Sequence, residues 1–238
     1  MTNDQVIVSN PEEISYSQYI NRLLEIVRDC NREEYLSEVF MPFLRMCCPE
    51  KTKVIPVFDD RRPGSQNNIE TEFKKRMNLI CAQNEDESYT VPDYIFVPHD
   101  YTFYNPKRPF FMVETKLPKM LKEGKCYLPL EKTLNLNKTQ LRAEIKSCGK
   151  VIYTDGFTWM FLALDDNNQI IHLKGYKTIC LKLLKNKYYS TFEAENKIDI
   201  KRVDLTELGL EEFEISTEPT EWLDLKKSIY NLIDETRK

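Results

Sequence analysis

Two carboxylates and a lysine stand at the ends of two strand-like stretches in this sequence. An apolar run, residues 110–113, leads directly into Glu114 and, two positions later, into Lys116. Upstream, residues 91–97 form a second strand-like run, in which Asp93 directly follows a proline. If the two strands pair side by side, Asp93 and Glu114 meet at one end of a sheet, with Lys116 beside them.

This set of residues is typical of metal-dependent phosphodiester hydrolysis, which needs a divalent cation, an activated water and relief of charge on the phosphate. Mg²⁺ takes oxygen ligands and usually needs only one or two protein carboxylates. We expect Asp93 and Glu114 to supply these, with the backbone carbonyl of Thr115 as a further ligand. Because side chains alternate along a strand, Lys116 shares a face with Glu114, where its ammonium can position the attacking water and offset charge in the transition state.

An acid two residues before a lysine is a weak signal when it stands alone. The same pattern also begins at Glu72, Glu123, Glu144, Glu195, Asp199 and Asp224. None of those six combines a preceding apolar strand with a Pro-Asp strand upstream, and Glu114 has both. The alternative interpretation is that two surface strands end in ordinary charges.

A further acid lies in the N-terminal part of the chain. Residues 12–29 have helical spacing of apolar side chains, and Asn31 with Glu34 forms a capping-box pattern that predicts a second helix. Glu38 borders the apolar face of that helix, four residues before Pro42, which we expect to kink or end it. A carboxylate that faces a core is costly unless it is paired or binds a metal. Glu38 is therefore either a metal-site residue or an edge carboxylate that reaches solvent.

The remaining patterns predict a sheet with one crossover connection. We expect strands over residues 53–58, 90–97, 109–116, 150–153, 157–164 and 170–176, and helices over residues 70–82, 134–147 and 221–236. The strands at 90–97 and 109–116 should form an antiparallel pair. The strand at 109–116, the helix at 134–147 and the strand at 150–153 form a strand–helix–strand unit. Residues 117–133 are Lys-rich and predicted to be irregular, and residues 154–156 predict a turn.

Composition limits the class of protein. The 238 residues are 41% hydrophobic, which suffices for one large domain with a real core. The chain has no apolar run long enough to span a membrane, and its polar N-terminus is unlike a signal peptide. The cysteines number seven, with no Cys-x-x-Cys pair. We therefore expect neither a disulfide framework nor a zinc site, and reduced thiols in a cytoplasmic protein.

The distribution of charge is more informative than its sum. The net charge of −4 speaks against a nucleic-acid partner. However, residues 107–150 carry eleven Lys or Arg and four Asp or Glu, whereas residues 192–238 carry seven basic and thirteen acidic residues. The basic surplus surrounds Glu114 and Lys116, where a phosphate backbone needs it. The other interpretation is a solvated Lys-rich loop.

Several short motifs, in order along the chain, resemble the PD-(D/E)XK nuclease superfamily. They are Glu38 before Pro42-Phe43-Leu44, Pro92-Asp93, Glu114-Thr115-Lys116, Gln140 on the following helix, and Thr154-Asp155-Gly156 followed by Trp159. The likeness is to the N-terminal nuclease domain of type I restriction enzyme motor (R) subunits. It covers residues 31–165 within an expected nuclease-like domain at 1–185, and leaves residues 186–238 as an acidic C-terminal extension that ends in a helix.

The resemblance implies an α/β fold with a restriction-endonuclease-like mixed β-sheet flanked by helices. It implies a Mg²⁺- or Mn²⁺-dependent DNA endonuclease with a role in restriction or defence. Asp93 and Glu114 would bind the metal, Lys116 would be catalytic, and Glu38 would touch the metal site directly or through water. Gln140 would help to position the substrate or the lysine. The sequence departs from the family's Gln-xxx-Tyr motif, because Glu144 stands where the tyrosine is expected, which leaves the role of Gln140 open.

Alternatives of a different class remain at this point. A nuclease-fold module that recruits a protein or nucleic-acid partner without cutting is one, and RNA as the substrate is another. The family's motor subunits carry a helicase, but this chain has no GxxxxGK[ST] phosphate loop. Translocation on DNA would therefore require a separate motor or specificity protein. The sequence leaves the oligomeric state open.

Overall fold

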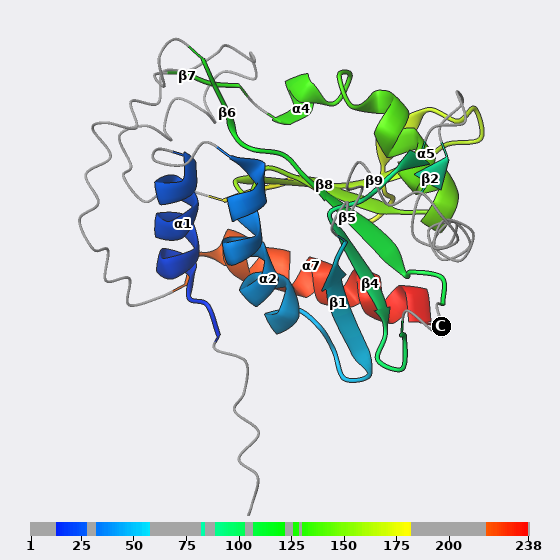
Figure 1. Cartoon of the computed structure of the whole chain (residues 1–238), viewed down its shortest axis with the longest axis horizontal. Helices are drawn as coiled ribbons and strands as arrows, with labels where there is room; N and C mark the ends of the chain where they lie inside the picture. The colour runs from blue at the N-terminus through cyan, green and yellow to red at the C-terminus, as the bar shows by residue number, and fades with distance from the viewer. Residues whose placement is uncertain are drawn as a thin grey trace, which may run out of the picture.

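The computed structural model describes residues 13–27, 32–57, 82–83, 89–102, 107–121, 126–128, 130–181 and 218–237. Within these ranges the chain forms a mixed β-sheet with helices packed on it, an α/β architecture (Figure 1). The predicted capping residue Asn31 and the helix predicted over residues 70–82 lie outside the described residues, except for Ala82, where the structure has the start of a strand instead of a helix end.

The sheet contains both of the strand relationships that the sequence predicts. Its order is β1 (Thr52–Pro56), β4 (Tyr94–Pro98), β5 (Phe111–Thr115), β8 (Val151–Thr154), β9 (Thr158–Leu164) and β10 (Ile170–His172), and β11 (Ile179–Cys180) also pairs with β9. β4 and β5 are antiparallel, with Tyr94 opposite Val113. β5 and β8 are parallel, and α5 (Lys138–Cys148) lies between them in the chain. The predicted antiparallel pair and the predicted crossover are therefore confirmed.

The predicted helices that the structure describes differ from the predictions at their ends, and α4 (Leu130–Thr133) was not predicted. Besides α4 and α5, the described helices are α1 (Tyr16–Glu25), α2 (Ser37–Met46) after a 3₁₀ turn η2 (Glu33–Leu36), and α7 (Thr220–Arg237). A capping box between Ser15 and Gln18 begins α1. α2 runs past Pro42, so the proline does not end that helix. None of the helices within the described residues is long and apolar enough to cross a membrane.

Two short antiparallel hairpins lie outside the main sheet. They are β2 (Ala82–Gln83) with β3 (Tyr89–Thr90), and β6 (Lys119–Leu121) with β7 (Cys126–Leu128). The irregular conformation predicted over residues 117–133 is therefore wrong for the β6–β7 hairpin and for α4. An irregular segment is predicted there because the sequence is rich in lysine. A lysine-rich composition does not reveal which backbone groups pair between strands.

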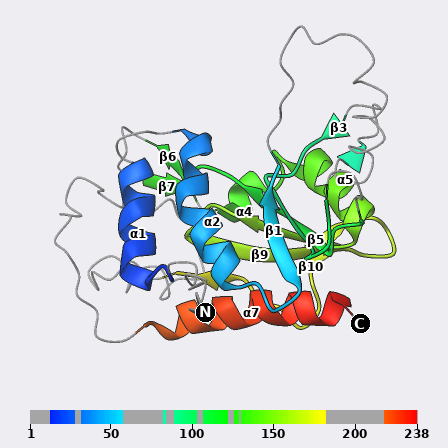
Figure 2. The ribbon, with the colours of Figure 1, turned by 60° about the horizontal axis from the view of Figure 1, so that its bottom comes forward.

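The two faces of the sheet bury different sets of helices. On one face, Phe96, Phe111 and Trp159 pack with apolar side chains of α1, α2 and α7, and the fully buried Trp222 of α7 contacts the rings of Tyr16, Tyr19 and Phe43. On the other face, alternate residues of the same strands pack against α4 and α5. Figure 2 shows α7 running along one side of the sheet and α5 on the other. This alternation decides which side chains of β5 can face α5.

The turn between β8 and β9 joins the sheet to the N-terminal helices. Asp155 Oδ1 accepts the N–H groups of the residues two and three positions later, at 3.1 and 2.8 Å. Gly156 has a φ of +90°, and its carbonyl accepts the Tyr19 hydroxyl at 3.0 Å and the Trp159 indole N–H at 3.1 Å. The turn predicted at residues 154–156 is confirmed, and it also anchors α1.

Gly156→Ala is expected to lower the free energy of unfolding by about 2–3 kcal/mol, because alanine is strained at positive φ and also crowded here. A Cβ at this position would lie 2.6 Å from Leu23 Cδ2 and 3.3 Å from Phe40 Cζ. Gly175→Ala is the matched control: its φ is +87° and no atom lies within 4 Å of the added Cβ. The control should lose only the backbone part, about 1 kcal/mol. Urea unfolding followed by tryptophan fluorescence measures both, and equal losses would contradict close packing of this turn on α1.

Candidate active site

Asp93 is fixed against the end of β5. The pairing of Tyr94 with Val113 places Asp93, one residue before β4, beside the last residue of β5. Its Oδ2 accepts both the backbone N–H and the side-chain hydroxyl of Thr115, each at 2.7 Å. This double contact fixes the Asp93 carboxylate at the end of β5. The residue that follows Thr115 in the chain is Lys116.

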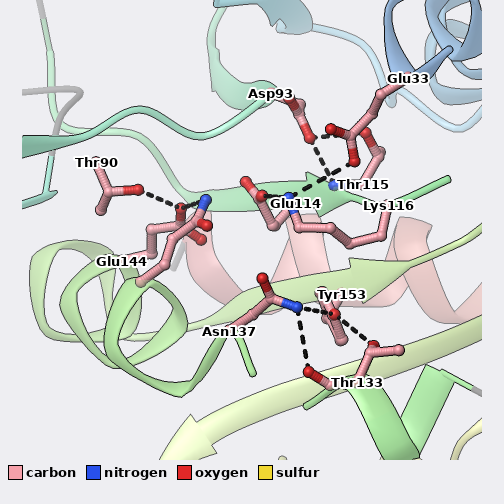
Figure 3. Close-up of polar contacts among 11 residues, drawn as sticks. Glu33, Thr90, Asp93, Glu114, Thr115, Lys116, Thr133, Asn137, Glu144 and Tyr153 are labelled. Carbon is pink, nitrogen blue, oxygen red and sulfur yellow. Dashed lines mark hydrogen bonds and ion pairs between the residues drawn. The ribbon is translucent and has the colours of Figure 1, made fainter. Parts of the chain in front are cut away.

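Glu114 and Lys116 form an ion pair at the same end of β5. Glu114 is 1% exposed, and its Oε1 accepts a hydrogen bond from Lys116 Nζ (Figure 3). The backbone N–H of Lys116 donates to the carbonyl of Thr154 at 2.8 Å, which continues the parallel pairing with β8 beyond the end of β5. The structure therefore brings together Asp93, Glu114 and Lys116, the three residues on which the sequence argument depends.

A third carboxylate, which sequence reasoning did not assign to the site, reaches it from α5. Glu144 is fully buried, and its Oε1 accepts hydrogen bonds from Gln140 Nε2 at 3.0 Å and from the Thr90 hydroxyl at 3.4 Å. Within the described residues, neither Glu144 Oε2 nor Glu114 Oε2 receives a hydrogen bond from another donor group. The two carboxyls lie within hydrogen-bonding reach of one another, so a proton on either of them can bridge the pair. A signal for Glu144 was present in the sequence, since it stands where the family pattern expects a tyrosine.

Gln140 lies next to this carboxylate. One helical turn separates Gln140 from Glu144 on α5, which is the spacing at which side chains meet. Its amide donates to Glu144, so Gln140 contacts the cluster through that acid. Thr115 is in place beside Asp93, and the metal-binding role of its carbonyl stays a prediction.

The N-terminal part of the chain contributes Glu33, from η2, to this cluster, and not Glu38, from α2. Glu33 Oε1 lies 3.6 Å from Lys116 Nζ, and its carboxylate is close to Asp93 (Figure 3). Glu38 instead ion-pairs with Arg22 of α1 at 2.5 Å, its side chain is 44% exposed, and it lines a surface groove between α1 and α2. The structure thus does not bring Glu38 to the site. Helical spacing located it beside the apolar face, but a partner on α1 holds it at the surface.

A hydrogen-bonded network of uncharged side chains lies next to the site, on β8 and before α5. Tyr153 on β8 is the parallel partner of Glu114. Its hydroxyl lies 2.8 Å from the Thr133 hydroxyl and accepts the Asn137 amide at 2.8 Å. These contacts tie β8 to the segment that joins α4 to α5. They help to fix the helix that carries Glu144.

Burial and mutual repulsion control the charges here. Burial raises the pKa of Glu144 to about 7, although the hydrogen bond from Gln140 opposes this rise. Burial, followed by the nearby Glu144 and Asp93 carboxylates, raises the pKa of Glu114 well above its usual value, and Lys116 lowers it. Burial lowers the pKa of Lys116, but Glu114 and Glu33 outweigh this effect and raise it, so the lysine stays protonated.

The donor chemistry of this cluster fits a hard divalent cation. Asp93 and Glu114 provide carboxylate oxygens, and two buried carboxylate oxygens lack a donor partner, which is unusual in a protein interior. In the part of the chain that the structure describes, no three His, Cys, Asp or Glu side chains form a ready-made metal site. The Lys116 ammonium and a carboxyl proton supply the positive charge within the cluster.

Without metal, in EDTA, the free energy of unfolding should fall as the pH rises from 4.5 towards 7. In that window the unfolded chain releases the proton of Glu144, whereas the folded protein, with a pKa of about 7, retains it, so the folded state loses its advantage as the pH rises. The shift from 4.5 to about 7 corresponds to at most roughly 3 kcal/mol. Urea unfolding across this pH range should show a flatter pH dependence of the free energy of unfolding for Glu144→Gln than for wild type. An unchanged slope would contradict a raised pKa of Glu144 in the folded protein.

Comparisons with known protein families, with curated proteins and with solved structures found no match to this chain. The assignment of a function therefore rests on the geometry of the cluster that contains Asp93, Glu114 and Lys116.

Proposed function

We propose that this chain is a Mg²⁺- or Mn²⁺-dependent endonuclease of the PD-(D/E)XK type, with a restriction-endonuclease-like fold, that hydrolyses phosphodiester bonds in DNA. The observation that carries the proposal is the convergence of Asp93, Glu114 and Lys116 at one end of the β4–β5 pair. The order of motifs along the chain supports the same class. The proposed setting is restriction or defence against foreign DNA, with a separate motor or specificity protein as a partner.

Each residue of the cluster has a distinct role in this proposal. Asp93 and Glu114 hold the cation, and the Thr115 carbonyl is a further ligand. The bound cation supplies a Lewis acid for the phosphate and lowers the pKa of a coordinated water. Lys116 remains protonated, and its side chain is 25% exposed, so the ammonium can reach a substrate while it stays attached to the cluster. There it orients the attacking water and offsets the charge that develops on the phosphate.

Glu33 and Glu144 act on Lys116 and Glu114 rather than on the substrate. Glu33 attracts the Lys116 ammonium from the side of η2, at 3.6 Å. This attraction keeps the Lys116 ammonium near the end of β5 instead of extended into solvent. Asp93 is held by Thr115 in a similar way, so the lysine and a ligand of the proposed cation are both positioned in advance.

Basic residues of α4 and α5 supply the proposed contact with the DNA backbone. Several lysines and arginines of residues 107–150 are engaged within the protein: Lys107 with Asp100, Arg108 with the Ser147 carbonyl, Lys138 with Gln169 and Lys150 with Thr236. Lys132 of α4 and Lys146 of α5 are exposed. These two therefore remain the best described candidates for phosphate contacts.

One observation favours the non-cleaving binding module as a second candidate. Glu114 is 1% exposed, and its described contact is an ion pair with Lys116 rather than an open coordination position. A nuclease fold that only recruits a partner needs no access to this carboxylate. Cleavage assays separate the two candidates directly.

Lys116→Ala should lower the rate of plasmid nicking by about a hundredfold or more, because it removes the ammonium that stabilises the transition state. Supercoiled plasmid and single-stranded DNA, each with Mg²⁺ or Mn²⁺, are the substrates. Lys174→Ala, at an exposed lysine in the loop after β10, is the matched control and should cut like wild type. EDTA should abolish the activity of both active proteins.

Two outcomes of this assay would count against the nuclease. Nicking that persists in Lys116→Ala would mean a contaminant or a different active site. Absence of nicking in wild type under every condition would favour the binding module.

Reversing two charges, Lys132→Glu with Lys146→Glu, should weaken DNA binding and make its salt dependence shallower by about one unit of log–log slope for each lysine that contacts a phosphate. Fluorescence anisotropy with labelled duplex DNA at increasing salt measures both quantities. Lys174→Glu is the control for a general change in charge. An unchanged affinity and slope in the double variant would place the DNA elsewhere on the protein.

A further inference from the structure

The carboxyl group of Glu144 is built into the interface between α5 and the sheet. Glu144 is 0% exposed, and the buried residues around it on the same helix are Leu141, Ala143, Ile145 and Cys148. It therefore occupies a position on the apolar side of α5, directly over the strand that carries Glu114. Helical spacing makes this the place for a leucine or a methionine.

The two oxygens of this carboxylate have different surroundings. Oε1 is held by the Gln140 amide at 3.0 Å and the Thr90 hydroxyl at 3.4 Å, which fixes the orientation of the group. Oε2 has no donor partner, and neither does Oε2 of Glu114. Figure 3 shows Glu144 and Glu114 directed towards one another from α5 and β5. Two oriented, unpartnered and buried carboxylate oxygens thus share one small space.

We propose that Glu144 is a further ligand of the divalent cation, which it binds through Oε2 together with Glu114. This inference rests on the proposed metal-dependent function and deepens it. The cation site then draws on β5 and α5 as well as on Asp93, and Gln140 and Thr90 become positioning residues that hold the third carboxylate.

The energetics favour a ligand over a purely structural acid. A carboxylate taken out of water costs several kcal/mol unless a cation or hydrogen bonds compensate. Two hydrogen bonds compensate one oxygen of Glu144, whereas within the described residues the other oxygen faces only the second carboxyl, that of Glu114. A divalent cation compensates both orphan oxygens at once, because hard cations bind carboxylate oxygens strongly.

The test is Mn²⁺ binding measured by calorimetry, with Glu144→Gln as the variant. Glutamine keeps an oxygen that accepts from Gln140 and Thr90, and its amide can donate to Glu114, so the metal-free protein should be at least as stable as wild type. The affinity for Mn²⁺ should nevertheless fall by about tenfold or more, because a charged ligand is lost. Glu131→Gln, at an exposed acid of α4, is the matched control and should bind like wild type.

A second variant guards against a folding defect. Glu144→Met fills the same space with an apolar group, and a well-packed apolar residue is often neutral or stabilising at a buried charge. It should raise the unfolding temperature in EDTA and lower Mn²⁺ affinity as Glu144→Gln does. Circular dichroism confirms that each variant is folded before the titration.

The outcomes separate this inference from the nuclease proposal. If Glu144→Gln and Glu144→Met bind Mn²⁺ like wild type while Asp93→Asn does not, Glu144 is only a proton-sharing structural acid and the inference is overturned, with the nuclease proposal intact. If wild type binds no Mn²⁺ at all, both proposals fail. Loss of affinity in both Glu144 variants, with Glu131→Gln unaffected, supports the third ligand.

Discussion

The ion pair between the Lys116 ammonium and the buried Glu114 carboxylate is the interaction on which this edge of the sheet depends. Three further acids lie near this pair and come from separate parts of the chain: Glu33 from η2, Asp93 from the residue before β4 and Glu144 from α5. Like charges in a desolvated site repel one another strongly. The Lys116 ammonium offsets part of that repulsion, and the raised pKa values of Glu114 and Glu144 favour proton uptake by this pair, so the cluster attracts further positive charge.

The Asp93–Glu114–Lys116 part of the site could be predicted because local patterns encode it. Alternation along β5 places Glu114 and Lys116 on one face wherever the strand lies in the sheet. Neighbouring strands in sequence usually pair, which brings Asp93 to the same end. The mixed sheet follows from the same kind of reasoning, because a strand–helix–strand unit joins the parallel strands β5 and β8, whereas the antiparallel strands β4 and β5 are joined without a crossover helix.

The remaining acids could not be located in this way, because partners on distant elements decide where they point. Helical spacing puts both Glu38 and Glu144 at or beside an apolar face. Arg22 on α1 holds Glu38 at the surface, whereas Glu144 meets Glu114 across the interface between helix and sheet. Glu33 depends on the 3₁₀ turn that precedes α2, and the sequence predicted an ordinary helix start there. The β6–β7 hairpin was missed for a related reason, since its pairing is not visible in a lysine-rich composition.

The position of the two glutamates also bears on the choice between an enzyme and a binding module. A docking surface acts through exposed groups, so Glu114 and Glu144, which are 1% and 0% exposed, would take no direct part in one. A chain that only needed to fold would gain stability from an apolar residue at position 144, because such a residue carries no desolvation cost. Carboxylates enclosed in this way are accessible only to a small species, such as a proton or a metal ion. The buried pair therefore has the physical character of an ion site, and the Lys116 ammonium contacts that pair through Glu114.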